Sequence, residues 1–266
     1  MLARGMTGWL VAAAYALAGA RRRVVGRLKA GWRLPVVVHA LPPARLEGIL
    51  SWLGRNGVLD SLWLTFDDGW ATLAESVPIL EKYNVHALVF IAPGQTLRGN
   101  VWTEEAMRLG VPAEVWRSWY PLPEAERNAR LAGAAARATR RGPGRSLLSA
   151  EDIASLSGHP LLSVENHTWS HLSAPHRPAG EVAGEIERAQ ETLAEWTGRR
   201  PKWLAWPFGR GTPELDAVAA GFGLKTLYTR KGYEIGPCRN MALEGVTFQE
   251  NLGRVLGAWP RVGETL

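Results

Sequence analysis

Two adjacent carboxylates follow an apolar run near the start of the chain. The run, residues 62–66, is typical of a buried strand, and Asp67, Asp68 and Gly69 come directly after it. In α/β proteins, ligands bind where such strands end. Adjacent side chains on an extended backbone point in opposite directions, so one Asp can bind a metal while the other faces a substrate. Because Asp and Gly also favour turns, these residues alone are more simply explained as a polar turn.

Two histidines four residues apart, His167 and His171, form a second candidate group. On a helical turn this spacing places both imidazoles on one face, as in helical zinc sites. Two imidazoles and one carboxylate leave a coordination position open, as in a catalytic zinc site. Two surface histidines would have the same spacing, so the pair gains weight only together with the Asp-Asp-Gly turn.

Alternating strand and helix patterns place these two groups at one end of the same sheet. Strand patterns occur at 35–39, 62–66, 87–91, 161–165, 203–206 and 224–228. Helix patterns occur at 43–55, 71–83, 180–197 and from 212 onward, and Ser-Ala-Glu-Asp at 149–152 is a capping-box signature for the start of a short helix. Strands that alternate with helices indicate a parallel sheet or barrel, which predicts an α/β fold. The carboxyl ends of its strands would then bring the carboxylates and the histidines together.

Three motifs resemble, in order, those of NodB-type polysaccharide deacetylases (carbohydrate esterase family 4). They are Thr-Phe-Asp-Asp-Gly at 65–69, His-Thr-Trp-Ser-His at 167–171 and Pro-Phe-Gly at 207–209. The likeness covers about residues 35–255 and implies a distorted (β/α) barrel, a TIM-like barrel of the NodB homology type. Ala205 stands where many members have Arg. A branch resembling poly-N-acetylglucosamine deacetylases also has Ala there.

The resemblance implies a set of metal ligands and a mechanism. Asp68, His167 and His171 would bind a divalent metal, expected to be Zn²⁺, with Co²⁺, Ni²⁺ or Mn²⁺ as alternatives. Asp67 would be the general base that activates water, and the backbone N–H of Phe208 would help form the oxyanion hole. A divalent metal lowers the pKa of water and polarises an amide carbonyl, so this set suits hydrolysis of an N-acetyl group.

Supporting roles follow from the same resemblance. Thr168 would steady the metal loop, and Trp206 and Pro207 would support the site or contact the substrate. Arg239 is a candidate to replace the Arg that is missing at position 205. Residues Glu165 and Asn166 flank the histidine motif and are expected to support it.

The general acid is not assigned by a motif. The family's late Leu-x-His motif supplies this acid, but no His follows His176 in this chain. His39 is the candidate, because it follows the strand at 35–38 and should lie at the same end of the sheet. A histidine that merely ends a strand is the simpler alternative.

The resulting prediction is a metal-dependent hydrolase that removes N-acetyl groups from an N-acetylated sugar or polysaccharide. The missing late His leaves open a catalytically weak glycan-binding relative. An O-acetyl esterase or a deformylase would use the same residues.

Residues 95–146 interrupt the alternation of strands and helices. They contain four prolines, and seven arginines lie between Arg117 and Arg145. We predict an insertion or lid, partly helical over 124–141. It is either a solvated basic excursion or a cover that helps to hold an anionic or sugar substrate.

Charge separates an N-terminal arm, residues 1–34, from a deacetylase-like domain, residues 35–266. Residues 1–46 carry eight Lys and Arg side chains and no acidic one, whereas the whole chain has a net charge of +6. The arm joins an apolar run to arginines, which favours an anionic membrane surface over nucleic acid as a partner. We expect an uncleaved helix on a membrane or on the domain, with a signal peptide as the alternative.

Composition sets wider limits. The length of 266 residues and the 46% hydrophobic content fit one large domain or two small ones. The single cysteine, Cys238, excludes an internal disulfide and a multi-cysteine zinc site. The expected location is cytoplasmic or peripheral on the membrane, with an exported form as the alternative.

Overall fold

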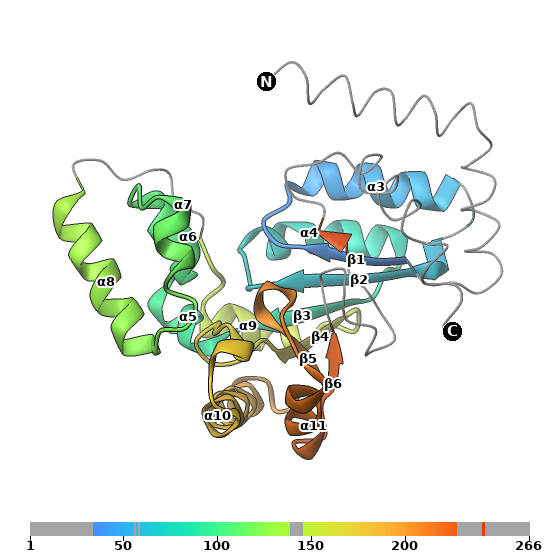
Figure 1. Cartoon of the computed structure of the whole chain (residues 1–266). Coiled ribbons are helices and arrows are strands. Elements are labelled where there is room, and N and C mark those ends of the chain that lie inside the picture. Colours follow the sequence, from blue (N-terminus) through green and yellow to red (C-terminus); the bar gives the residue numbers. More distant parts are fainter. Residues whose placement is uncertain (1–33, 56, 58, 139–145, 228–240, 243–266) are drawn as a thin grey trace, which may run out of the picture.

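A computed structural model describes residues 34–55, 57, 59–138, 146–227 and 241–242 of the chain. The strands are β1 Leu34–Val38, β2 Leu62–Asp67, β3 Ala87–Ile91, β4 Leu162–Asn166, β5 Trp203–Ala205, β6 Lys225–Leu227 and β7 Met241–Ala242. They form one sheet in the order β6-β5-β4-β3-β2-β1-β7, and every pairing is parallel. The sheet curls into an open half-barrel (Figure 1). The predicted fold class is therefore confirmed.

Helices connect the strands, as the alternating patterns predict. They are α3 Pro43–Arg55, α4 Thr72–Tyr83, α5 Pro93–Arg98, α6 Trp102–Arg108, α7 Ala113–Arg117, α8 Glu124–Arg137, α9 Ala150–Ser157, α10 Ala179–Thr197 and α11 Pro213–Gly221. Single turns of 3-10 helix are η1 Leu59–Ser61, η2 Ala174–His176 and η3 Pro207–Gly209. The predicted helix over 180–197 is confirmed as α10, and it ends at Gly198, whose φ of 70° suits a glycine. The predicted capping box is also confirmed, because Ser149 and Asp152 bond reciprocally at the start of α9.

The main core lies between the sheet and helices α3, α4 and α9. Helix α3 buries the apolar residues that its periodicity places on one face: Leu46, Ile49, Leu50 and Leu53. Burial of each such side chain is worth about 1.5–3 kcal/mol. A second cluster joins β5 to α10 and α11 and includes Leu204 and Trp206. These two cores fix the strand ends that carry the candidate site.

Helices α5 to α8, residues 93–137 (the α5–α8 segment), form a group of their own. In Figure 1 they lie to the side toward which the arrows of β1, β2 and β3 point, beyond the carboxyl ends of these strands. The group has its own aromatic cluster, which includes the buried side chains of Trp102, Trp119 and Tyr120. The helix predicted within 124–141 is present as α8, which ends at Arg137.

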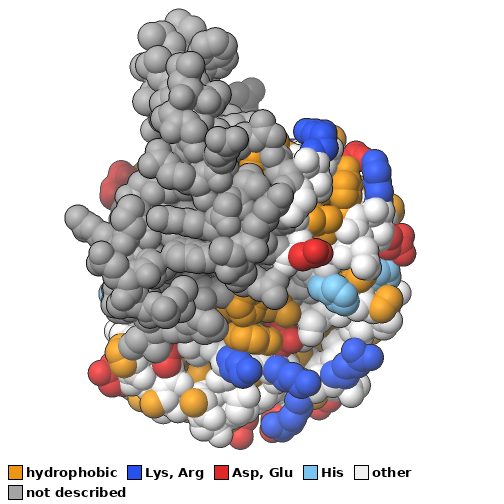
Figure 2. Space-filling view, turned by 90° about the vertical axis from the view of Figure 1, so that its right-hand side faces the viewer, with side chains coloured by type: hydrophobic (Ala, Val, Ile, Leu, Met, Phe, Trp, Pro, Cys, Tyr) orange, Lys and Arg blue, Asp and Glu red, His pale blue; other side chains and the backbone are white. Residues whose placement is uncertain are grey.

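Basic side chains gather on part of the opposite end of the sheet. Figure 2 views the molecule from the side of the strand amino ends, where Lys and Arg side chains gather along the lower rim. A cavity of about 390 Å³ lies beside the first residues of β4 and is bordered by Arg199, Arg200 and Lys202.

Several predictions fall on residues outside the described part of the chain. They concern the arm up to residue 33, Arg239 and the tail beyond residue 242. None of the described helices is both long enough and apolar enough to cross a membrane.

Candidate metal centre

Asp68, His167 and His171 meet at the carboxyl ends of the strands. The Asp68 Oδ1 atom lies 3.2 Å from His171 Nε2 and 3.5 Å from His167 Nε2. All three side chains are buried, and their ligand atoms lie within 4.8 Å of one another. Ligands at Zn–N and Zn–O distances of about 2.0–2.1 Å in a tetrahedron are about 3.3 Å apart. The spacing of these atoms therefore fits a divalent metal such as zinc.

The turn after β2 separates the two carboxylates. Strand β2 ends at Asp67, and Asp68 has a left-handed φ of 70°. Its divergence from Asp67 therefore comes from a tight turn, and the expectation of two residues on one extended strand is wrong. Gly69 continues the turn at φ 76°, and a Cβ there would lie 2.6 Å from Ile91 Cδ1. Trp70 Nε1 donates to Asp68 Oδ2 at 3.3 Å and holds the carboxylate in place.

The two histidines lie on a loop after β4, residues 167–172, which we call the metal loop. The expectation of a helical turn is wrong, because these residues have no helical structure. Thr168 and His171 have left-handed φ values of 62° and 53°, which bend the chain so that both rings face Asp68. Asn166 Oδ1 accepts a hydrogen bond from Thr168 N at 2.7 Å and fixes the start of the loop. Thr168 itself is fully buried.

A backbone carbonyl orients His167. Its Nδ1 lies 2.7 Å from the carbonyl oxygen of Ala205, and only a protonated Nδ1 can bond to that oxygen. The lone pair of the neutral ring is then on Nε2, which faces Asp68. Metal-binding histidines are commonly held in this way. Position 205 thus serves the site through its main chain.

The electrostatics of the group match a cation site. Although burial alone would raise it, the pKa of Asp68 is held well below its usual range by His171 and His167. Burial lowers the pKa of His171, which favours the neutral ring that can bind a metal. The pKa of His167 is raised despite burial, because Asp68 and Asp67 favour its charged form. A divalent cation would satisfy the same carboxylates.

Asp67 lies beside the three ligands with one oxygen unpaired. The residue is 2% exposed, and its Oδ1 atom has no hydrogen-bond partner among the described residues. Burial raises the pKa of this carboxyl, partly opposed by the nearby His167 and His39. A buried carboxylate with a free oxygen and a raised pKa is a suitable proton acceptor.

His39 lies at the same end of the sheet, as predicted from the strand that precedes it. Its Nε2 atom is 4.0 Å from Asp68 Oδ2, and 28% of its side chain is exposed. The ring is therefore close to the ligand group and open to solvent on one side.

The residues of the third motif take different places. Phe208 has a φ of 61° within η3, and its ring centroid is 4.6 Å from that of His171. Pro207 is buried beside it. The Trp206 ring turns into the core, where Nε1 donates to Asp216 Oδ1 at 2.9 Å, so it supports β5 from behind. Arg239 lies outside the described residues.

Glu165 does not support the metal loop as expected. Side chains alternate along a strand, and its carboxylate accepts hydrogen bonds from Lys202 N and Trp203 N at 2.6 and 2.8 Å instead. Several supporting residues have no signal in the sequence. They come from the α5–α8 segment and from α10: Gly94, Trp102, Arg127 and Glu185. These residues belong to no motif, so only the fold places them beside the loop.

Solved structures with the same fold are polysaccharide deacetylases and related proteins. A polysaccharide deacetylase from Bacillus cereus is 16% identical, with a TM-score of 0.55 over 84% of this chain and 69% of that one. The Streptococcus pyogenes deacetylase PplD, solved with acetate, is 15% identical, with a TM-score of 0.56 over 84% and 98%. IcaB from Ammonifex degensii is 17% identical, with a TM-score of 0.52 over 86% and 98%. At this identity the likeness shows the fold.

The sequence itself matches a family model. No curated protein sequence matches the chain. The model of the polysaccharide deacetylase family matches residues 55–227, which include all three motifs and well over half of the chain. The chain therefore belongs to the polysaccharide deacetylase family.

Proposed function

We propose that this protein is a metal-dependent hydrolase that removes N-acetyl groups from an N-acetylated sugar or polysaccharide. The observation that carries the proposal is the buried group of Asp68, His167 and His171 with the unpaired Oδ1 of Asp67 beside it. Family membership supports the class of substrate. The Ala at position 205 agrees with a branch that acts on poly-N-acetylglucosamine.

The three ligands would hold the metal, with Zn²⁺ as the first candidate. When bound, a divalent metal supplies positive charge that polarises an amide carbonyl and lowers the pKa of water. Asp68 contributes one negative charge, and the two imidazoles bind as neutral rings. This donor set leaves room for water and substrate.

The remaining residues move protons and stabilise charge. Asp67 Oδ1 accepts a proton from the attacking water as its oxygen bonds to the amide carbon. The backbone N–H of Phe208 donates to the carbonyl oxygen as negative charge develops there, a contribution of about 3 kcal/mol. The C–N bond then breaks, and the leaving nitrogen takes a proton from His39 Nε2. The products are acetate and a free amine.

The decisive experiment replaces Asp67 by Asn. We expect Asp67→Asn to bind as much metal as the wild type, because Asp67 is not a ligand, and to release acetate from an N-acetylglucosamine oligomer at least about 100-fold more slowly. Asp60→Asn is the control, since this exposed carboxylate precedes β2 at the far end of the sheet. Full activity in Asp67→Asn would exclude this mechanism.

A catalytically weak glycan-binding protein is the second candidate function. It is favoured by the absence of any His after His176. Binding of N-acetylglucosamine oligomers without acetate release, in protein loaded with Zn²⁺ or Co²⁺, would support it. Matched N-acetyl, O-acetyl and N-formyl substrates would separate a deacetylase from an esterase or a deformylase, which would use the same residues.

We also propose that the basic arm, residues 1–34, holds the protein on an anionic membrane surface. Seven cationic side chains and no acidic one within residues 1–34 support this location. Removal of residues 1–30 should abolish binding to vesicles that contain anionic lipid. Unchanged partitioning of the shortened protein would contradict the proposal.

A further inference from the structure

The α5–α8 segment donates hydrogen bonds to the main chain of the metal loop. Three consecutive loop carbonyls each accept one such bond. Gly94 N donates to the carbonyl oxygen of Trp169 at 3.0 Å. Arg127 Nη2 donates to the carbonyl oxygen of Ser170 at 3.1 Å. Trp102 Nε1 donates to the carbonyl oxygen of His171 at 3.0 Å. The donors come from α5, α8 and α6. Three separate helices thus converge on one stretch of loop backbone.

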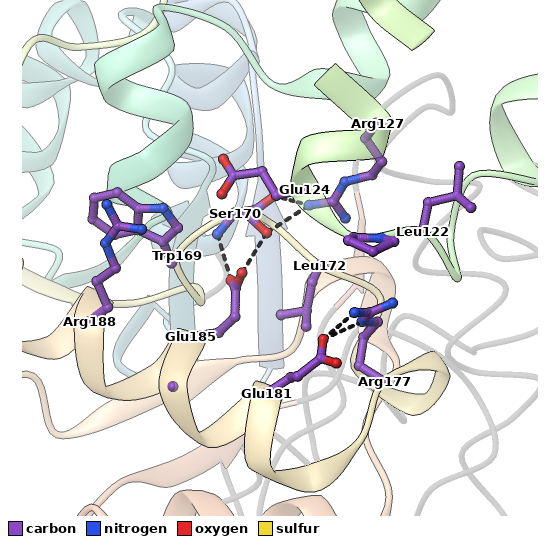
Figure 3. A pocket seen from close by; sticks show the side chains of 12 residues that line it. Leu122, Glu124, Arg127, Trp169, Ser170, Leu172, Arg177, Glu181, Glu185 and Arg188 are labelled. Carbon is purple, nitrogen blue, oxygen red and sulfur yellow. Dashed lines mark hydrogen bonds and ion pairs between the residues drawn. The ribbon is translucent and has the colours of Figure 1, made fainter. Parts of the chain in front are cut away.

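Arg127 is the one charged donor among these three. Its side chain is 1% exposed, and the same Nη2 also donates to the Ser170 hydroxyl at 2.6 Å. Figure 3 shows Ser170 between Arg127 on one side and Glu185 of α10 on the other. A buried guanidinium is costly unless its N–H groups are bonded. Arg127 Nη1 has no hydrogen-bond partner among the described residues, and Nη2 is directed at Ser170, which lies between the two histidine ligands in the sequence.

Helix α10 binds Ser170 from the side opposite Arg127. The Glu185 carboxylate accepts from Ser170 N at 2.7 Å and from the Ser170 hydroxyl at 2.8 Å. The Arg188 guanidinium stacks on the Trp169 ring, with Cζ 3.6 Å from its centroid (Figure 3). The amide, carbonyl and hydroxyl of Ser170 are therefore all bonded to α8 or α10.

A cavity of about 260 Å³ lies beside these contacts between the metal loop, α8 and α10. It is bordered by Arg127, Glu185 and Trp169 among others (Figure 3). The hydrogen bonds therefore provide contacts where close packing is incomplete. The left-handed φ values of Thr168 and His171 give the loop a conformation that the surrounding structure must maintain.

We propose that Arg127, with Trp102 and Glu185, is a positioning residue that sets the metal affinity by fixing the backbone between His167 and His171. The α5–α8 segment is then part of the metal centre's support and not only a cover over the substrate. This inference rests on the proposed function, because it needs a metal at the site. Partners that orient metal ligands typically change affinity or activity 10- to 100-fold when they are removed.

The test is a titration of metal-free protein with Co²⁺, together with thermal unfolding of the same metal-free samples. In Arg127→Met the Kd for Co²⁺ should rise roughly 10- to 100-fold. The matched control is Arg130→Met, which removes an exposed Arg three residues further along α8 and should stay within about twofold of the wild type. A purely structural role would lower the unfolding temperature of Arg127→Met and leave the Kd unchanged, which would overturn the proposal.

A second variant covers the case in which Arg127→Met fails to fold. Trp102→Phe keeps an aromatic ring but loses the Nε1 donor, and its Kd should rise in the same direction by a smaller factor. Trp116→Phe is the control, because this indole packs edge-on against Trp102 in the same cluster. Equal Kd values for Trp102→Phe and Trp116→Phe would overturn the proposal. If the wild type bound no divalent metal, the proposed function would fail together with it.

Discussion

Left-handed backbone angles concentrate at the candidate site. Asp68, Thr168, His171 and Phe208 all have φ between 53° and 70°, and the fifth such described non-glycine residue, Asn84, ends α4. Each angle of this kind costs of order 1 kcal/mol or more and persists only where the surroundings enforce it. This clustering indicates that the geometry of the candidate site lowers the free energy of unfolding.

Gly94 tests how closely the loop is packed. A Cβ at this position would lie 2.8 Å from the Trp169 oxygen and Nε1, so Gly94→Ala must push the metal loop away. We expect a loss of about 1–3 kcal/mol in the free energy of unfolding. Gly48→Ala, in α3 with nothing near its Cβ, should instead gain about 0.5–1 kcal/mol. Urea denaturation of both variants measures the contrast, and equal effects would refute it.

His39 tests the acid half of the mechanism. A general acid must be protonated, so the rate should fall at high pH as the acid loses its proton. In His39→Gln we expect kcat to fall by about 100-fold and the alkaline limb of its pH profile to disappear. His159→Gln is the control, because His159 pairs with Glu81 at 3.1 Å outside the site. If the pH profile of kcat were the same in His39→Gln as in the wild type, another group would have to protonate the leaving nitrogen.

The residues of the candidate metal centre could be identified from the sequence, but the residues that support them could not. The carboxylate pair and the His-x-x-x-His spacing are local patterns that can be read directly. The loop shape could not be read, because Asp, Thr, His and Phe rarely adopt left-handed angles. Arg127 and Trp102 contact loop residues 43 and 69 positions away, and such distant pairs leave no local pattern.

At the level of elements, the sheet has a weak junction between β4 and β5. Only Asn166 and Leu204 pair across it, whereas β3 and β4 pair over five positions. The Glu165 carboxylate of β4 spans the junction by accepting from Lys202 N, just before β5, and from Trp203 N, the first residue of β5. Beyond it, the bond from His167 to the Ala205 carbonyl spans the same junction at the site.

Glu165 should make the stability of this junction depend on pH. Burial raises the pKa of its carboxyl, so the ionised form destabilises the folded state at pH values above the folded pKa. That penalty disappears as the pH falls below the unfolded pKa, where both states are protonated. Glu165→Gln should therefore gain stability relative to the wild type between pH 5 and pH 7. Urea denaturation at both pH values measures this change, and a pH-independent difference would contradict it.

The predictability of the elements follows their periodicity. Helices α3 and α10 have regular apolar spacing and were placed within a residue or two. The first part of the segment from 95 to 146 has no such regular spacing, and its helices α5, α6 and α7 have only six, seven and five residues. Helix α8, with 14 residues, is the one that the sequence predicts. The arrangement of these helices depends on an aromatic cluster whose partners the sequence does not identify.

At the scale of the whole molecule, the metal should add stability without being needed to fold. The main core is formed by α3, α4, α9 and the sheet and does not include the ligands. Removal of metal with a chelator should lower the unfolding temperature but leave the far-ultraviolet circular dichroism unchanged. At a free metal concentration of 100 Kd the stabilisation is about 2.7 kcal/mol. Complete unfolding by the chelator would show that the core is insufficient.

Two tryptophans in the described part of the chain bond directly to residues of the candidate metal centre. The Trp70 indole bonds to the carboxylate of Asp68, and the Trp102 indole bonds to the main chain of His171. Indole emission responds to nearby charge, and it is quenched by ions with partly filled d shells. The site thus has its own fluorophores, and Co²⁺ loading should dim the emission in a way that Zn²⁺ does not. Metal occupancy of the site can then be followed by tryptophan fluorescence in unlabelled protein.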